Sequence, residues 1–240
     1  MSNLADKRYL MWAVLLLSTA HISFGQILSP GESLIVIPTA EMHTDATLTI
    51  GYGQVPNLLA AQPAIEAEAH RFTHEVYLVS LQFIPRVTLH FRSSFRNEDG
   101  ELDGEDRMLG VKSILLRERR NRPGLAVGVR DIAGTRLRHA SYAVLSKGFD
   151  FGPVRTGFTV GYSKQILDAR GLEMKDGPFY GVSISGWNRA ELMLDYDTRF
   201  YYAGARVWPL KWIWVTGFAA DWEHSGFAFG ISRVLFGSDS

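Results

Sequence analysis

Cysteine is absent from this sequence of 240 residues. Disulfides, thiolate metal sites and a cysteine nucleophile are therefore excluded, and so is a lipid anchor attached to cysteine. A net charge is also absent, because 25 lysines and arginines balance 25 aspartates and glutamates. This balance excludes a long-range field that would attract nucleic acid or an anionic membrane surface. Any electrostatic role must be local.

Long hydrophobic runs are missing after the N-terminus. The most apolar later stretch, residues 207–214, is interrupted by Pro209 and Lys211. A spanning helix needs about 20 apolar residues. If this chain crosses a membrane, strands must therefore do so, since a closed barrel also satisfies every backbone polar group in lipid.

The N-terminus carries the pattern of a secretory signal. Lys7 and Arg8 precede an apolar run over residues 9–17, and small residues precede a cleavage point after Gly25. We therefore predict a signal peptide over residues 1–25. The alternative is a membrane anchor, for which a run of roughly a dozen residues is short.

Residues 26–46 form a separate N-terminal segment. Its stretch from Ile35 to Ala40 is apolar without alternation, and Pro38 makes it a poor central strand. The sequence leaves two interpretations open, an additional short strand or a plug within a barrel lumen.

The rest of the chain consists of short alternating stretches. Phe158, Val160 and Tyr162, for example, alternate with small or polar residues. This pattern is typical of a transmembrane β-barrel with an apolar exterior and a polar lumen. We predict an all-β, antiparallel up-and-down barrel over residues 47–236, with a soluble β-sandwich as the alternative. Its twelve strands are expected at 47–54, 74–84, 86–96, 107–117, 124–132, 139–148, 154–165, 178–187, 190–198, 199–208, 211–222 and 225–236.

The connections and the last strand give further expectations. Short turns should alternate with outer loops, and the acidic segment 97–106 is expected to be a hydrated outer loop. In the last strand, Phe227, Phe229 and Ile231 are out of phase with Val234 and Phe236, which predicts a bulge near residues 232–233. Aromatic residues near strand ends suit interfacial girdles. These are Tyr142, Trp187, Tyr201, Tyr202, Trp208, Trp212, Trp214 and Trp222.

One face of several strands is charged. A charge that faces lipid at the bilayer midplane costs about 2–4 kcal/mol, so this face is assigned to the lumen. Isolated charges in a narrow interior are costly, and we expect them to pair across it, with contact to sugar groups as the alternative role. The candidate lumen charge network comprises His90, Arg92, Lys112, Arg130, Lys147, Glu191, Asp195 and Arg206.

Two other groups of residues could carry chemistry. His90 and Ser94 lie four residues apart on one strand, about 13 Å, which is too far for direct proton transfer. His70 and His74, with nearby glutamates, could form a weak metal site, although solvated loop charge explains them as well. We therefore expect no enzymatic activity and no cofactor.

Five segments, 34–40, 49–52, 106–112, 123–131 and 142–147, share their motifs with a known family. The most specific is Pro-x-Leu-Ala-Val-Gly-x-Arg-Asp, followed by Tyr-x-Val-x-Ser-Lys. From about residue 31 to 165 the chain resembles the YjbH-domain family of exopolysaccharide-associated outer-membrane proteins. The resemblance implies a barrel in the outer membrane of a Gram-negative bacterium, linked to extracellular polysaccharide and biofilm matrix.

These observations lead to three functional hypotheses. The first is a non-catalytic scaffold or conduit that supports polysaccharide production or export. The others are a general small-solute pore and an outer-membrane enzyme that acts on lipid or glycan. Expected partners are outer-membrane lipid, polysaccharide and other secretion components, and nucleic acid is not expected.

Overall fold

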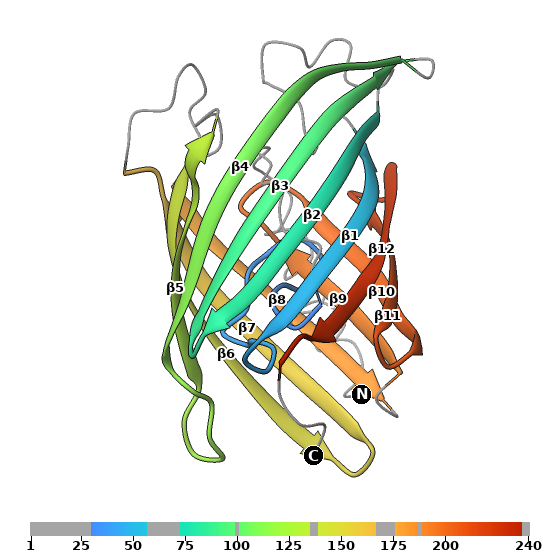
Figure 1. Cartoon of the computed structure of the whole chain (residues 1–240). Helices are drawn as coiled ribbons and strands as arrows, with labels where there is room; N and C mark the ends of the chain where they lie inside the picture. The colour runs from blue at the N-terminus through green and yellow to red at the C-terminus, as the bar shows by residue number, and fades with distance from the viewer. Residues whose placement is uncertain are drawn as a thin grey trace, which may run out of the picture.

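A computed structural model shows a closed antiparallel barrel of twelve strands (Figure 1). It describes residues 30–56, 73–98, 101–134, 139–166, 176–186 and 189–236, and the predicted signal peptide lies outside them. Neighbouring strands pair in chain order, and β1 closes the barrel against β12. Within the described ranges, no helix is long and apolar enough to cross a membrane. The strands are β1 (Thr47–Pro56), β2 (Thr73–Ile84), β3 (Val87–Glu98), β4 (Glu101–Leu116), β5 (Gly124–Gly134), β6 (Ala140–Phe151), β7 (Val154–Lys164), β8 (Gly177–Gly186), β9 (Ala190–Tyr196), β10 (Tyr201–Leu210), β11 (Ile213–Ala220) and β12 (His224–Val234).

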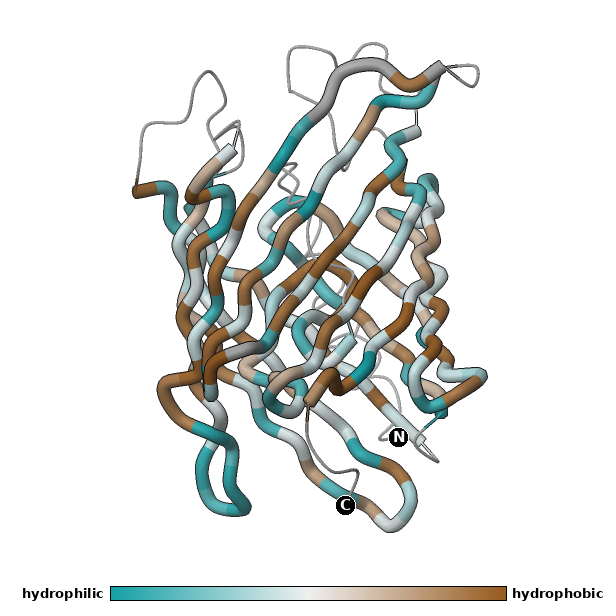
Figure 2. Tube along the Cα trace, viewed as in Figure 1, coloured by the Kyte–Doolittle hydropathy of each residue, from teal (hydrophilic) through white to brown (hydrophobic). Residues whose placement is uncertain are grey.

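The two faces of the wall follow the predicted alternation. On β7, Phe158 and Val160 are both 52% exposed, whereas Thr159 is buried. On β3, Phe91 points outward, whereas Arg92 is buried in the interior. Figure 2 shows the same alternation of hydrophobic and hydrophilic residues along the strands. The predicted fold class is confirmed, because side chains two residues apart share a face of each strand.

The acidic segment 97–106 is not the loop that we predicted. β3 continues to Glu98 and β4 begins at Glu101, so most of this segment forms a paired extension of the hairpin. Arg96 lies opposite Asp103 in the ladder, after a register shift that follows Phe95. Strand pairing satisfies backbone groups in water as well as in lipid, so the ladder continues into this charged segment.

The predicted bulge in the last strand is also wrong. The register of β12 is continuous against β1, from Phe227 opposite Gln54 to Val234 opposite Thr47. The change of phase arises because β12 ends at Val234, and beyond it Phe236 is 80% exposed. A strand end therefore explains the pattern without an extra residue in the strand.

Some aromatic residues predicted for the interfacial girdles lie in the lumen instead. Tyr142, Tyr202 and Trp214 are buried and belong to the hydrophobic core, and Trp208 packs against it. Trp222 is 79% exposed, and its place in a girdle stays a prediction. Because inward and outward side chains alternate, position near a strand end does not decide which face an aromatic ring occupies.

The described part of the N-terminal segment lies within the barrel (Figure 1). We call residues 30–44 the plug. Its apolar tip, Leu34 to Ile37, is buried and packs in the same cluster as Trp214. Two close approaches require glycine in the wall: a Cβ atom at Gly181 would lie 2.6 Å from Leu34 Cδ1, and one at Gly204 would lie 2.9 Å from Ile35 Cδ1. The plug is thus fitted to the wall.

Candidate functional site

The plug is a tight backbone loop. The backbone nitrogen of Leu34 donates to the carbonyl oxygen of Ile37 at 3.0 Å. The backbone nitrogen of Thr39 donates to the carbonyl oxygen of Glu32 at 3.0 Å. A bridge between Ser33 and Pro38 joins the two arms. These contacts leave several polar groups of the loop directed at the wall, and each must find a partner because it is buried.

Asp195 on β9 binds the tip of the loop. Its Oδ2 accepts hydrogen bonds from three successive backbone nitrogens, those of Ile35 at 3.0 Å, Val36 at 3.0 Å and Ile37 at 3.3 Å. Asp195 is buried on the inward face of the strand. Three aligned N–H groups form a concave anion site, which compensates the carboxylate for its loss of water.

Lys112 on β4 binds the opposite side of the loop. Its Nζ donates to the backbone oxygens of Glu32 at 3.1 Å, Thr39 at 3.2 Å and Glu41 at 2.6 Å. An ammonium group has three protons, so this arrangement uses the whole donor capacity of the side chain. Lys112 is buried and is held by main-chain oxygens.

Arg206 on β10 connects the loop to the wall. Its Nη2 donates to the backbone oxygen of Leu34 at 2.7 Å, and its Nη1 lies 3.4 Å from that of Ser33. The same guanidinium pairs with Glu191 at 3.1 Å, and its Nε donates to the hydroxyl of Thr216 at 3.0 Å. The planar group thereby fixes the loop against two neighbouring strands.

Glu32 is the plug's own buried charge. Its carboxylate accepts a hydrogen bond from the Ser80 hydroxyl at 2.8 Å and lies 3.2 Å from Nδ1 of His90. Burial alone would raise the pKa of Glu32, but His90, Lys112 and His43 lower it to about 2. Glu32 is therefore a carboxylate at neutral pH.

Arg92 and Arg130 complete the buried part of the candidate network. Both are inward-facing and buried, on β3 and β5. The Arg130 guanidinium lies 5.1 Å from the centroid of the Tyr142 ring. A cation over an aromatic face is stabilised by the ring quadrupole.

Lys147 does not face the lumen, contrary to the sequence prediction. On β6 the buried residues are Tyr142, Val144 and Ser146, and Lys147 is on the opposite phase with the exposed Leu145. The preceding residue, Ser146, pairs with Gly124, which is the first residue of β5. Lys147 therefore lies beside the β4–β5 connection. There its Nζ donates to Glu118 Oε1 at 3.2 Å and to the backbone oxygen of Arg119 at 2.6 Å. A charge at the end of a strand reaches a polar partner and need not turn inward.

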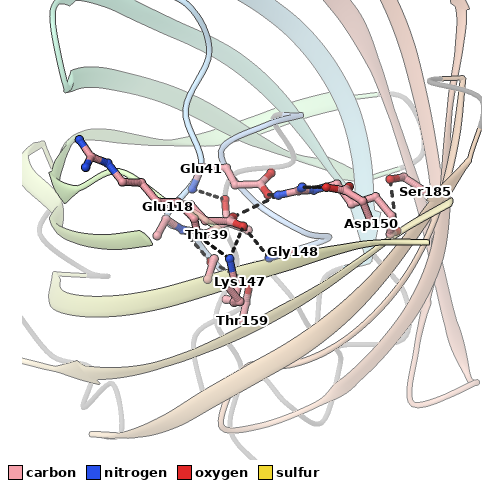
Figure 3. Close-up of polar contacts among 12 residues, drawn as sticks. Thr39, Glu41, Glu118, Lys147, Gly148, Asp150, Thr159 and Ser185 are labelled. Carbon is pink, nitrogen blue, oxygen red and sulfur yellow. Dashed lines mark hydrogen bonds and ion pairs between the residues drawn. The ribbon is translucent and has the colours of Figure 1, made fainter. Parts of the chain in front are cut away.

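Glu118 organises a polar cluster at this end of the barrel (Figure 3). Besides Lys147, it accepts hydrogen bonds from the Gly148 nitrogen at 3.0 Å and from Arg155 Nη2 at 3.1 Å. Arg155 also lies 3.8 Å from Glu41, at the end of the plug. Farther along the plug, Ser146 accepts a hydrogen bond from the Ala40 nitrogen at 2.9 Å. The wall therefore binds the plug from its tip to its exit.

The structure thus gives the predicted charges a different main role. Arg206 and Glu191 do pair with each other, but Lys112 and Asp195 bind the backbone of the N-terminal segment. We name Lys112, Asp195 and Arg206 the plug seat. Sequence reasoning missed Ser80, Ser146 and Thr216, since small polar residues are the usual lumen filling of a barrel and carry no distinctive signal.

The described residues give no support to the catalytic and metal-binding hypotheses. His90 lies beside Glu32 of the plug. Of the suggested metal ligands, His70 lies outside the described residues and His74 lies in β2. Among the described residues, no group of three or more histidine or acidic side chains is placed to hold a metal ion.

Known proteins resemble this chain over most of its length. A family model described as exopolysaccharide biosynthesis protein YbjH matches residues 29–233. No curated protein matches the chain. A solved structure described as KdgM porin is 7% identical and aligns with a TM-score of 0.49, covering 79% of this chain and 99% of that chain. The family match includes the plug and continues to β12, well beyond the segments whose motifs were recognised.

Proposed function

Because the chain belongs to the YjbH family of exopolysaccharide biosynthesis proteins, we propose that it is an outer-membrane barrel that supports extracellular polysaccharide production or export. In this role it acts as a plugged scaffold without catalytic activity. Its location is the outer membrane of a Gram-negative bacterium, reached by the predicted signal peptide.

The observation that carries this proposal is the plug in its seat. The loop from Leu34 to Ile37 is buried in the barrel, and Asp195, Lys112 and Arg206 bind its backbone. A general diffusion pore needs a continuous water-filled lumen, and a barrel of this size has only modest internal space. A filled lumen favours a scaffold, or a conduit that is closed at rest, over an open pore.

The exterior supports the membrane location. Exposed apolar side chains, such as Phe91, Phe158 and Leu192, project from strands around the wall. Backbone groups are paired around the closed sheet, which is the requirement for strands in lipid. The expected partners are therefore membrane lipid on the outside, with polysaccharide and other secretion components at the two ends.

Deletion and complementation test this proposal. A strain that lacks the protein should lose most of its cell-associated and secreted polysaccharide, and the wild-type chain should restore it. Asp150→Asn, which changes an exposed carboxylate, is the matched control and should restore it equally. Unchanged polysaccharide in the deletion strain, together with reduced uptake of small sugars, would show a solute pore instead.

A further inference from the structure

A long groove runs across the outside of the barrel wall from β6 to β11. It has a volume of about 1060 Å³, and residues lining it include Phe158, Val160 and Leu194. These side chains are all about half exposed and face away from the lumen. The groove therefore lies outside the wall and opens toward the membrane, with Asp195 of the plug seat in the strand segment at its floor.

Strand register explains its shape. One wall is the row Leu145, Val160, Tyr180, Tyr196 and Tyr201, in which each residue pairs with the next across a strand boundary. The other wall is a parallel row that begins at Lys147 and ends at Ala203 and Ala219. The residues between the rows point inward and expose only backbone to the outside. The result is a furrow that crosses six strands.

The two walls differ in height. The rings of Tyr180 and Tyr196 lie 5.0 Å apart, those of Tyr196 and Tyr201 lie 4.7 Å apart, and the hydroxyls of Tyr180 and Tyr201 are 3.3 Å apart. They form a continuous aromatic wall. In the opposite row, Val182 and Leu194 are followed by Ala203 and Ala219, and these two alanines are too small to fill the space beside Tyr201. Methyl side chains beside stacked rings leave the width that an extended hydrocarbon chain needs.

The length of the furrow matches one leaflet. Five spacings between six strands, at about 4.8 Å each, give roughly 24 Å. Strands in such barrels tilt by about 35–45°, so the furrow descends through roughly 14–17 Å of the membrane. A bilayer core is about 30 Å thick, and each leaflet fills about half of it.

The ends of the furrow differ in polarity. At the β6 end of the furrow, Lys147 lines the groove. Its ammonium group lies beside Glu118, and a fifth of its side chain is exposed. At the other end stands the indole of Trp222. A second copy of the barrel would present the same concave surface, and two concave surfaces do not fill each other.

We propose that this groove binds one acyl chain of an anionic phospholipid, with the phosphate beside Lys147. The inference uses the proposed membrane location but not the polysaccharide role. The lipid lies directly behind the row that contains Ser146 and Asp195, so it packs against the part of the wall that holds the plug.

The test measures retained lipid. Barrels reconstituted with equal amounts of phosphatidylglycerol and phosphatidylcholine are extracted into detergent, and bound lipid is counted by native mass spectrometry. The wild-type barrel should retain one phosphatidylglycerol. Ala203→Trp fills the furrow and should lower retention at least tenfold. Ala205→Trp adds the same ring to an exposed position of β10 outside the groove and should retain one lipid.

Three outcomes would overturn the proposal: no lipid on the wild-type barrel, equal retention by Ala203→Trp and Ala205→Trp, or a dimer that buries the groove. Heat-modifiable migration in gels shows whether each variant is folded, and Ala219→Trp replaces Ala203→Trp if that variant does not fold. Lys147→Gln should reduce the preference for phosphatidylglycerol severalfold, and an unchanged preference contradicts the phosphate position. A normal lipid count in a chain whose deletion leaves polysaccharide unchanged would remove only the proposed function.

Discussion

The Asp195 carboxylate lies 3.0 Å from the backbone nitrogen of Val36, although 159 residues separate them in the chain. This bond joins the N-terminal segment to the ninth strand in the interior of the barrel. A buried carboxylate without partners is costly, and a loop of backbone N–H groups without acceptors is costly as well. Each group satisfies the other, so the plug and the wall stabilise one another.

Replacement of Asp195 separates charge from hydrogen bonding. Asp195→Asn keeps an oxygen that can accept from the loop, and we expect it to lower the free energy of unfolding by about 1 kcal/mol. Asp195→Leu leaves three buried N–H groups without an acceptor and should cost about 3 kcal/mol or more. Urea unfolding in detergent micelles, followed by tryptophan fluorescence, measures both. Equal stability of the two variants would contradict the role of the acceptor.

Lys112→Met tests the other side of the loop. The change removes the donor for three backbone oxygens, and we expect a loss of about 2–4 kcal/mol in the free energy of unfolding. Lys147→Met is the matched control, because its ammonium lies in a partly exposed ion pair and should cost less than about 1 kcal/mol. Similar losses in the two variants would show that the hydrogen bonds from Lys112 to the plug add no more stability than a partly exposed ion pair.

A disulfide can test the position of the plug directly, since the chain has no cysteine of its own. A Cβ atom at Gly124 would lie 3.3 Å from Cβ of Ala40 in the plug, so the pair Ala40→Cys and Gly124→Cys should cross-link under mild oxidation. The pair Ile50→Cys and Gly124→Cys places one thiol on the outer face and should not react within one molecule. Mass spectrometry of peptides after proteolysis reads out the cross-link. Its absence from the first pair would show that the loop is elsewhere.

Glu32 should make the stability of the folded barrel depend on pH. Its pKa in the folded barrel, about 2, is below the ordinary value of about 4.5. A lowered pKa contributes stability above pH 4.5 that is lost as the pH falls through about 2. The urea midpoint should therefore fall between these pH values in the wild-type barrel. Glu32→Gln should show a smaller decrease over the same interval, and an identical decrease would contradict the assignment.

The sequence predicts the wall well and the interior poorly. All twelve strands were expected because alternation with a period of two repeats in most of them, as at Phe158, Val160 and Tyr162. The same rule placed Arg92, Lys112 and Asp195 on the inner face. It failed at Lys147, since near the end of a strand a long side chain can remain on the outer face and reach a polar partner.

The plug contacts could not be predicted from the sequence. Asp195 and Lys112 bind main-chain atoms, and every residue carries the same backbone groups, so the pattern of side chains around residues 32–41 gives no sign of the partner. The sequence showed only that this segment is apolar and contains Pro38. Three-dimensional closure of the barrel was needed to bring β4, β9 and the loop together.

Conductance across a planar bilayer shows whether the plug closes the lumen. The wild-type barrel should show no steady open current, because the plug occupies the lumen. A variant in which glycine and serine replace the loop from Leu34 to Ile37, combined with Asp195→Leu to remove its anchor, should open stable channels. A steady current through the wild-type barrel, equal to that of the variant, would show that the plug leaves the lumen open.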